Sequence, residues 1–253
     1  MPLQCRPKRP HRAWNSITFA ASKPAQTSKR DGLIQRSLPY LFRQPELGTP
    51  ASLFPATQLP GEPVARFIRQ AADGTRHCLV FTDGCCLANG QPTARGGWAF
   101  VHGTLADSTP LTISGRLESQ GPTDCVLPAT CNRAELRAAI AALRYRDWSV
   151  LNISSIVIAA DSQLVVTGAT EWSRAWLASG WCASKGQPVQ NVDLWRALLT
   201  RVAGLKTRGV RVGFWKVGRA ENAVADRAAK MAALEQDVAK YRDVVENCDG
   251  GVV

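Results

Sequence analysis

Four acidic residues, far apart in the chain, have the types and positions expected of a divalent-metal site. Asp83 follows the apolar segment HCLVFT, and Asp161 follows the apolar segment SIVIAA. Glu135 and Asp226 each lie near the start of an alanine-rich segment. Clustered carboxylates repel one another unless cations neutralise them, and hard oxygen ligands favour Mg²⁺ or Mn²⁺. Because two such ions can stabilise the attacking and leaving oxygens of a phosphodiester, the pattern indicates phosphodiester chemistry.

Each acid also has an ordinary structural explanation. An Asp after a strand often closes a turn or caps a helix, and a Glu near a helix start suits the helix dipole. The joint pattern favours a site, because two strand-end acids and two helix acids occur in a consistent order.

The spacing of apolar residues predicts the elements that must position these acids. Strands are expected at residues 77–82, 96–101, 111–117, 155–160 and 210–215. Helices are expected at residues 132–146, 162–170, 170–178, 192–204 and 222–241. The order βββαβαααβα predicts an α/β fold with a five-stranded mixed sheet flanked by helices. Since parallel strands end at one edge of a sheet, Asp83 and Asp161 are expected to meet there.

The charge is concentrated in the N-terminal part of the chain. The net charge is +11, and residues 1–76 contribute 12 Lys/Arg against 4 Asp/Glu. Residues 1–63 lack a clear period and are rich in Pro, Ser, Arg and Gln, which is typical of disorder. We therefore expect a basic, mostly disordered or loosely packed extension over 1–76, a folded domain over 77–240 and a tail over 241–253. The early segment fits a mitochondrial presequence, a nucleic-acid arm, a nuclear address or an untargeted tail.

Several classes of protein are disfavoured. No apolar run approaches the roughly 20 residues that cross a bilayer, so we expect no membrane partner. The eight cysteines form no CxxC pair and only three histidines occur, so a zinc site is not expected. Free cysteines favour a reducing, intracellular location, in the nucleus or cytoplasm, with the mitochondrion left open. We expect a monomer.

Five segments together resemble the type 1 ribonuclease H family. They are FTDGCCLANG with GGWAFV, TCNRAEL, AADSQLVV, SGWCASKGQPVQNVDLW and FWKVGRAENAVADRAAK, and they cover about residues 78–235. The form of the last segment is similar to the fungal branch. The resemblance implies a ribonuclease H-like fold and a hydrolase that cuts the RNA strand of RNA–DNA hybrids endonucleolytically. It implies a two-metal mechanism that leaves 5′-phosphate and 3′-hydroxyl ends.

The same resemblance implies roles for individual residues. Asp83, Glu135, Asp161 and Asp226 would be the catalytic, metal-binding carboxylates for two Mg²⁺ ions, with Mn²⁺ as a possible substitute and Asp83 as the bridge.

Asn132 would contact ribose 2′-hydroxyls, by which proteins distinguish RNA from DNA. Thr130 and Asn191 would hold a phosphate of the DNA strand.

A helical protrusion for substrate handling is also implied, with Trp172, Trp181 and Lys185 as contacts. Arg174 and Lys185 are the only cations between Asp161 and Asn191, so we expect a weaker grip than in strongly basic members. The early cations of the extension would compensate with salt-sensitive affinity.

Two positions depart from the family pattern. Lys216 stands where the family commonly has a catalytic His, ten residues before the last Asp. A Lys with a pKa near ~10.4 stays protonated, so we predict slower turnover and an altered pH profile. Replacing Lys216 by His is expected to raise kcat in a hybrid-cleavage assay, and a fall or no change removes Lys216 from the mechanism. Cys131 replaces an Asn, which predicts looser discrimination of hybrid from double-stranded DNA.

Other functions remain open at this point. A nucleic-acid-binding module of the same fold, with weak or no catalysis, is the main alternative. Cleavage by the wild type but not by Asp83→Asn separates the two. A domain derived from a reverse-transcribing element and a nuclease for Holliday junctions are further alternatives.

Overall fold

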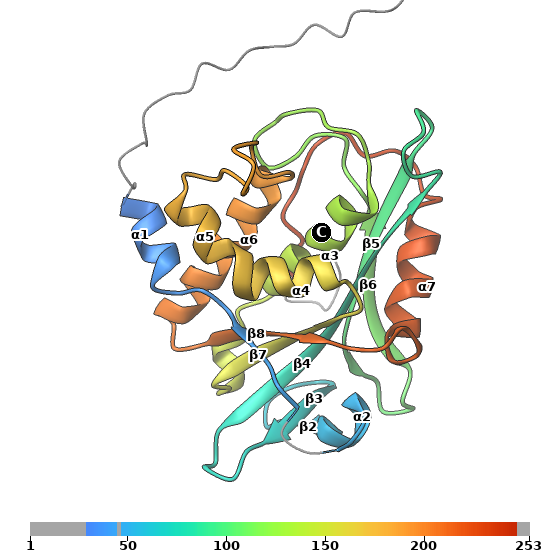
Figure 1. The fold of residues 1–253 in the computed structure, drawn as a ribbon. Coiled ribbons are helices and arrows are strands. Elements are labelled where there is room, and N and C mark those ends of the chain that lie inside the picture. The colour runs from blue at the N-terminus through green and yellow to red at the C-terminus, as the bar shows by residue number, and fades with distance from the viewer. Residues whose placement is uncertain (1–28, 45–46, 247–253) are drawn as a thin grey trace, which may run out of the picture.

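A curled mixed β-sheet organises the chain in a computed structural model that describes residues 29–44 and 47–246. Eight strands form it: β1 (Tyr40–Leu41), β2 (Ala56–Gln58), β3 (Ala65–Gln70), β4 (Arg76–Leu87), β5 (Arg95–Thr104), β6 (Pro110–Arg116), β7 (Ser155–Ala160) and β8 (Arg211–Lys216). The strand order is β1-β8-β7-β4-β3-β5-β6, and β2 pairs with β3. β1, β8, β7 and β4 run parallel, whereas β3, β5 and β6 pair antiparallel (Figure 1).

Helices and helical turns connect the strands. They are α1 (Lys29–Gln35), α2 (Pro50–Leu53), α3 (Cys131–Arg144), η1 (Trp148–Leu151), α4 (Gln163–Thr167), η2 (Gly168–Trp172), α5 (Ser173–Ala178), α6 (Val192–Thr207), η3 (Arg219–Asn222) and α7 (Ala223–Ala232). The predicted ribonuclease H-like α/β fold is confirmed, and all five expected strands are present as β4 to β8.

Helices α3 and α7 pack on opposite faces of the sheet. Gly84 of β4 lies against α3, where an added Cβ would stand 2.1 Å from the backbone nitrogen of Glu135. Gly97 of β5 lies against α7, where an added Cβ would stand 2.3 Å from the carbonyl oxygen of Ala229. Gly84 pairs with Trp98 across the ladder, and side chains alternate between faces, so Gly97 faces the other way. Without a Cβ, these two glycines allow both helices to approach the strands closely.

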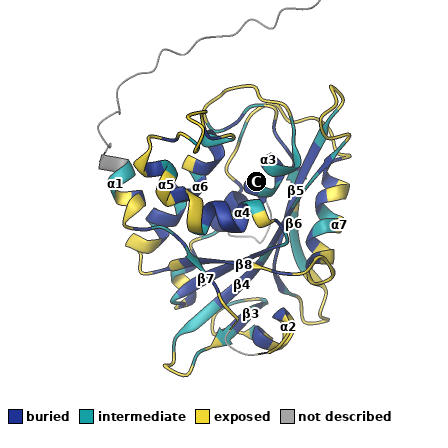
Figure 2. Cartoon of the chain, in the orientation of Figure 1, coloured by how far each residue is buried: buried dark blue, intermediate teal, exposed yellow. Residues whose placement is uncertain are grey.

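Strand β7 is buried on both faces, which explains its uninterrupted apolar sequence (Figure 2). One face contributes Ile156 and Ile158 to the main core with α3 and α6. The other face contributes Val157 and Ala159 to a second cluster that contains Trp215.

The N-terminal part of the chain differs from the expectation. The segment from 29 to 76, apart from 45–46, supplies α1, α2 and three additional strands, so it belongs to the folded unit. Phe42 and Phe54 are buried against Trp215 with ring centroids 5.3 and 6.1 Å away. These short elements lack a period of their own, and β1 pairs with β8, β3 with β4 and β2 with β3. Residues 1–28 of the predicted extension lie outside the described residues.

The last helix is shorter than predicted. It ends at Ala232 rather than at residue 241, and the chain then returns across β6 and α3. The backbone nitrogen of Ser119 donates to the carbonyl oxygen of Val238, and the ring of Tyr241 lies 4.4 Å from the guanidinium carbon of Arg137. The polar sequence beyond Ala233 forms these contacts instead of continuing an amphipathic helix.

Among the described residues, no helix combines the length and apolar character that crossing a membrane requires.

Candidate active site and nucleic-acid cleft

Asp83 lies inside strand β4 rather than after it. The strand was expected to end at residue 82, but it continues to Leu87 because β5 pairs with its second half, including Asp83 with Ala99. The parallel ladder with β7 stops earlier, at Phe81 paired with Ala159. The side of β4 toward β7 is therefore open at Asp83, and Asp161 directly follows β7 at this edge.

Glu135 reaches the same edge from α3. The close contact between Gly84 and the backbone of Ala134 and Glu135 places the second turn of α3 against β4, next to Asp83. Any Cβ at position 84 would collide with main-chain atoms, which cannot move aside as a flexible side chain does. The sequence TDG therefore fixes the distance between the strand and this helix.

Asp226 reaches the edge from the first turn of α7. Asn222 holds this helix start in place, because its Nδ2 donates to the carbonyl oxygen of Thr82 at 3.1 Å. Asn222 is 1% exposed. The bond joins the residue before Asp83 to the residue four positions before Asp226, so it couples two of the carboxylate-bearing elements.

The four carboxylates influence one another electrostatically. Burial raises the pKa of Asp83 to about 7, and the charges of Asp161, Asp226 and Glu135 also raise it, against a hydrogen bond from the Gly84 backbone. Burial likewise raises the pKa of Glu135, and Asp161 adds to the effect while a hydrogen bond from Ser162 opposes it. All four acids that the sequence singled out thus lie within electrostatic range of one another.

Each carboxylate is held by a separate partner. The Gly84 backbone nitrogen donates to Asp83 at 2.7 Å, and the Ser162 hydroxyl donates to Glu135 at 2.5 Å. Lys230 Nζ donates to Asp226 at 2.6 Å, and Arg219 Nε lies 3.4 Å from an Asp161 oxygen. In the part of the chain that the structure describes, no three Asp, Glu, His or Cys side chains are close enough to coordinate a metal ion as they stand. Mutual repulsion and these four separate partners explain the spread arrangement.

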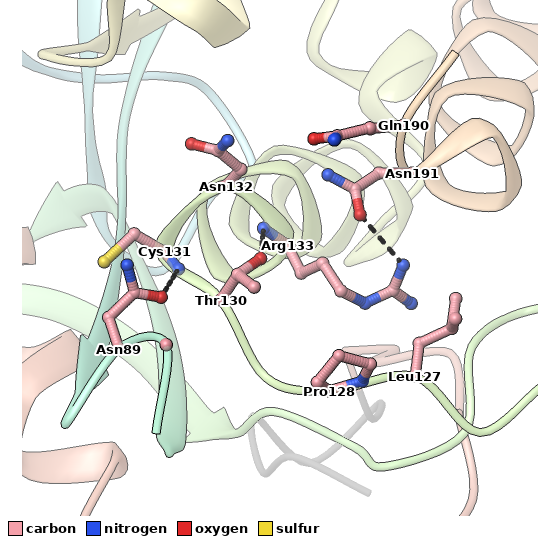
Figure 3. Close-up of a pocket in the computed structure, with 10 residues that line it drawn as sticks. Asn89, Leu127, Pro128, Thr130, Cys131, Asn132, Arg133, Gln190 and Asn191 are labelled. Atoms are coloured by element: carbon pink, nitrogen blue, oxygen red, sulfur yellow. Dashed lines mark hydrogen bonds between the residues drawn. The ribbon is translucent and has the colours of Figure 1, made fainter. Parts of the chain in front are cut away.

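An open pocket of about 460 Å³ adjoins the start of α3 (Figure 3). Thr130, Asn132 and Asn191, which were predicted to contact nucleic acid, all line it. Arg133 forms a bidentate ion pair with Asp193 at 3.0 and 2.8 Å, and its Nη1 also donates to Asn191 Oδ1 at 3.3 Å. This buried pair joins the start of α3 to the start of α6 beside the pocket.

Thr130 has a structural task besides its predicted contact. Its hydroxyl accepts a hydrogen bond from the Arg133 backbone nitrogen at 3.2 Å and thereby caps α3. We expect Thr130→Ala to lower the free energy of unfolding by about 1 kcal/mol, whereas Thr130→Ser retains the cap. Urea denaturation measures the loss. Equal stability of the Ala and Ser variants would contradict the capping role.

The predicted substrate protrusion is only partly accessible. Trp172 is 43% exposed and Lys185 is exposed, so both can meet a ligand. Trp181, in contrast, is 5% exposed, and Arg196 covers its ring at 5.2 Å. The expectation that Trp181 contacts substrate is therefore not met, since the ring packs inward beside Trp176.

Lys216, predicted to be catalytic, contacts a backbone carbonyl in this structure, and its role in catalysis stays a prediction. It is the last residue of β8, it is exposed, and its Nζ donates to the adjacent carbonyl oxygen of Val217 at 3.2 Å. Two other cations pair with the acids: Arg219 of the following turn with Asp161, and Lys230 with Asp226. Sequence reasoning missed Arg219, Asn222 and Ser162, although all three lie within four residues of a predicted acid or of Lys216.

Cys131 belongs to the pocket and stands in the first turn of α3. Its backbone nitrogen donates a hydrogen bond to Asn89 Oδ1 at 3.4 Å. Its Sγ contacts the carbonyl oxygen of Cys86 at 3.9 Å. A backbone donor is therefore already engaged at this position.

Comparisons with known proteins identify similar chains. The RNase H family model matches residues 75–234. The ribonuclease H of Afipia carboxidovorans is 38% identical over 63% of this chain and 94% of its own length. The ribonuclease H of Treponema pallidum is 34% identical over 61% of this chain and 89% of its own length. The crystal structure of LC9-RNase H1, a type 1 RNase H with the type 2 active-site motif, is 24% identical, covering 63% of this chain and 72% of that chain, with a TM-score of 0.44.

Proposed function

Because this chain belongs to the ribonuclease H family, we propose that it hydrolyses the RNA strand of RNA–DNA hybrids. The cleavage is endonucleolytic and leaves 5′-phosphate and 3′-hydroxyl ends. The observation that carries the proposal is the placement of four carboxylates, on β4, α3, the end of β7 and α7, within electrostatic range of one another. The pocket at the start of α3 includes Arg133, which lies two residues before Glu135.

The donor set fits hard divalent cations. Asp83, Glu135, Asp161 and Asp226 offer only oxygen ligands, as Mg²⁺ and Mn²⁺ prefer. Burial and mutual repulsion leave the negative charge at Asp83 poorly compensated, as its raised pKa indicates. These four residues would hold two cations. When bound, such ions supply activation of water and stabilisation of charge on the phosphate.

The remaining residues would position the substrate. Asn132 offers an amide that both donates and accepts hydrogen bonds, which suits a ribose 2′-hydroxyl in the shallow minor groove. Thr130 and Asn191, on the pocket wall, would hold a DNA-strand phosphate without reading sequence. The hybrid would thus lie across the start of α3, with the RNA strand over the carboxylates.

The direct test uses a hybrid labelled at the 5′ end of its RNA strand. Incubation with Mg²⁺ is expected to give internal RNA fragments that carry 3′-hydroxyl ends and serve as primers for a polymerase. Double-stranded DNA, double-stranded RNA and a chelator-treated sample serve as controls. Absence of cleavage of the hybrid at every Mg²⁺ and Mn²⁺ concentration would overturn the proposal.

The alternative is a binding module of the same fold with weak catalysis. Two observations on the described residues are compatible with weak catalysis. The four carboxylates are held by separate partners, and Lys216 stands where the family commonly has a catalytic His. Tight binding of the hybrid without any Mg²⁺-dependent cleavage would support the module.

A further inference from the structure

The turn at residues 218–222 brings one arginine to the carboxylates. Arg219 Nε lies 3.4 Å from an Asp161 oxygen, and the positive charge of Arg219 lowers the pKa of Glu135 against the larger effect of burial. The Arg219 side chain is 94% exposed. A guanidinium has five donors in a planar fork, so most of them remain available to a ligand here.

Both ends of this turn are anchored. The backbone nitrogen of Val217 donates to the carbonyl oxygen of Ala160 at 3.1 Å, directly before Asp161. The carboxylate of Glu221 accepts from the Gly218 backbone nitrogen at 2.9 Å, and Asn222 is tied to β4 through Thr82. The turn therefore holds the backbone of Arg219 beside the acid cluster while its side chain stays solvated.

We propose that Arg219 is a catalytic residue whose guanidinium contacts the scissile phosphate of the RNA strand. The inference rests on the proposed function and names a further residue of the same site. A guanidinium keeps its charge at all working pH values and matches two phosphate oxygens with two parallel hydrogen bonds. A phosphate arriving at the carboxylates carries negative charge into reach of the exposed fork, and the single contact with Asp161 is long enough to exchange.

The role in the reaction is electrostatic. A water oxygen forms a bond to phosphorus while the bond from phosphorus to the ribose 3′ oxygen breaks. The attacking water loses one proton to solvent and the leaving 3′ oxygen takes up one proton from solvent, so the protons balance, and the phosphate remains on the 5′ end of the next nucleotide. Arg219 exchanges no proton in this step, and it stabilises the charge that gathers on the phosphate oxygens.

Kinetics of Arg219 variants test the proposal. Arg219→Ala is expected to lower kcat about 100-fold with little change in KM, because the contact strengthens in the transition state. Arg219→Lys retains the charge but not the fork, so an intermediate kcat is expected. Adding ethylguanidinium to Arg219→Ala is expected to restore part of kcat. The matched control is Arg208→Ala, another exposed arginine paired with an aspartate, Asp147 at 3.1 Å, at the end of α6.

A second measurement separates an effect on catalysis from an effect on hybrid binding. Hybrid affinity is compared between Asp83→Asn and the double variant Asp83→Asn/Arg219→Ala, and less than a fivefold difference is expected. A kcat of Arg219→Ala within threefold of the wild type would overturn the proposal. The proposal would also be overturned if Arg219→Lys lost as much kcat as Arg219→Ala, ethylguanidinium restored none of it, and both variants melted at a lower temperature than the wild type. A wild type that cleaves no hybrid would instead refute the proposed function.

Discussion

An Asp83→Asn variant is expected to bind RNA–DNA hybrid but to cleave it at least about 10³-fold more slowly than the wild type. Asp83 is 7% exposed, and the charges of all three other carboxylates raise its pKa. An amide has the same shape but no charge, so cation binding and charge stabilisation are lost while the fold remains. Single-turnover cleavage and filter binding of the same labelled hybrid measure the two quantities.

The same variant is expected to unfold at a higher temperature in the absence of divalent ions. Removing one charge relieves repulsion that the folded state tolerates for function. Asp107→Asn is the matched control, because Asp107 lies in an exposed turn between β5 and β6 and caps the Thr109 backbone nitrogen. Cleavage by Asp83→Asn within tenfold of the wild type would contradict the assignment of Asp83.

The metal-free protein is expected to lose stability as pH rises from about 4 to about 7. The pKa of Asp83 is about 7 in the folded chain against an ordinary 3.8. Between these values the folded state holds a proton that the unfolded state has released, so increasing pH favours unfolding. The shift of about three units corresponds to at most about 4 kcal/mol. Urea denaturation at several pH values, with chelator present, measures the slope.

Two controls assign that slope to the acid cluster. Asp83→Asn is expected to flatten it, because the group with the raised pKa is gone. Saturating Mg²⁺ is expected to flatten it too, and to add about 2.7 kcal/mol when the free ion stands at 100 times its dissociation constant. A slope that persists unchanged in Asp83→Asn would assign the pH dependence to other groups with a raised pKa, such as Glu135, whose pKa burial also raises.

The sequence was sufficient for the central part of the fold. The short, uninterrupted apolar run SIVIAA is typical of a buried strand, and the helical spacing of apolar residues in α3 is typical of a packed helix. Three of the four acids were placed for the same reason, since Asp161 follows a predictable strand and Glu135 and Asp226 lie near predictable helix starts. Local pattern placed these three on their elements, whereas Asp83, expected after a strand, lies inside β4.

Only the tertiary structure determined the features that depend on pairing between segments distant in the chain. The extra strands from residues 40–70 form because β4 and β8 offer unpaired edges, which no local pattern in that basic segment reveals. The ladder with β5 likewise places Asp83 inside a strand, and the return of the chain after Ala232 ends α7.

Side-chain partners also depended on tertiary contacts. The sequence selected Lys216 because of its distance along the chain from Asp226, but the strand end directs its amine to a neighbouring carbonyl. The anchored turn instead brings Arg219 to Asp161, and packing buries Trp181 away from the cleft. Periodicity fixes which face of its own element a residue occupies, whereas contacts between elements distant in the chain determine which side chains meet.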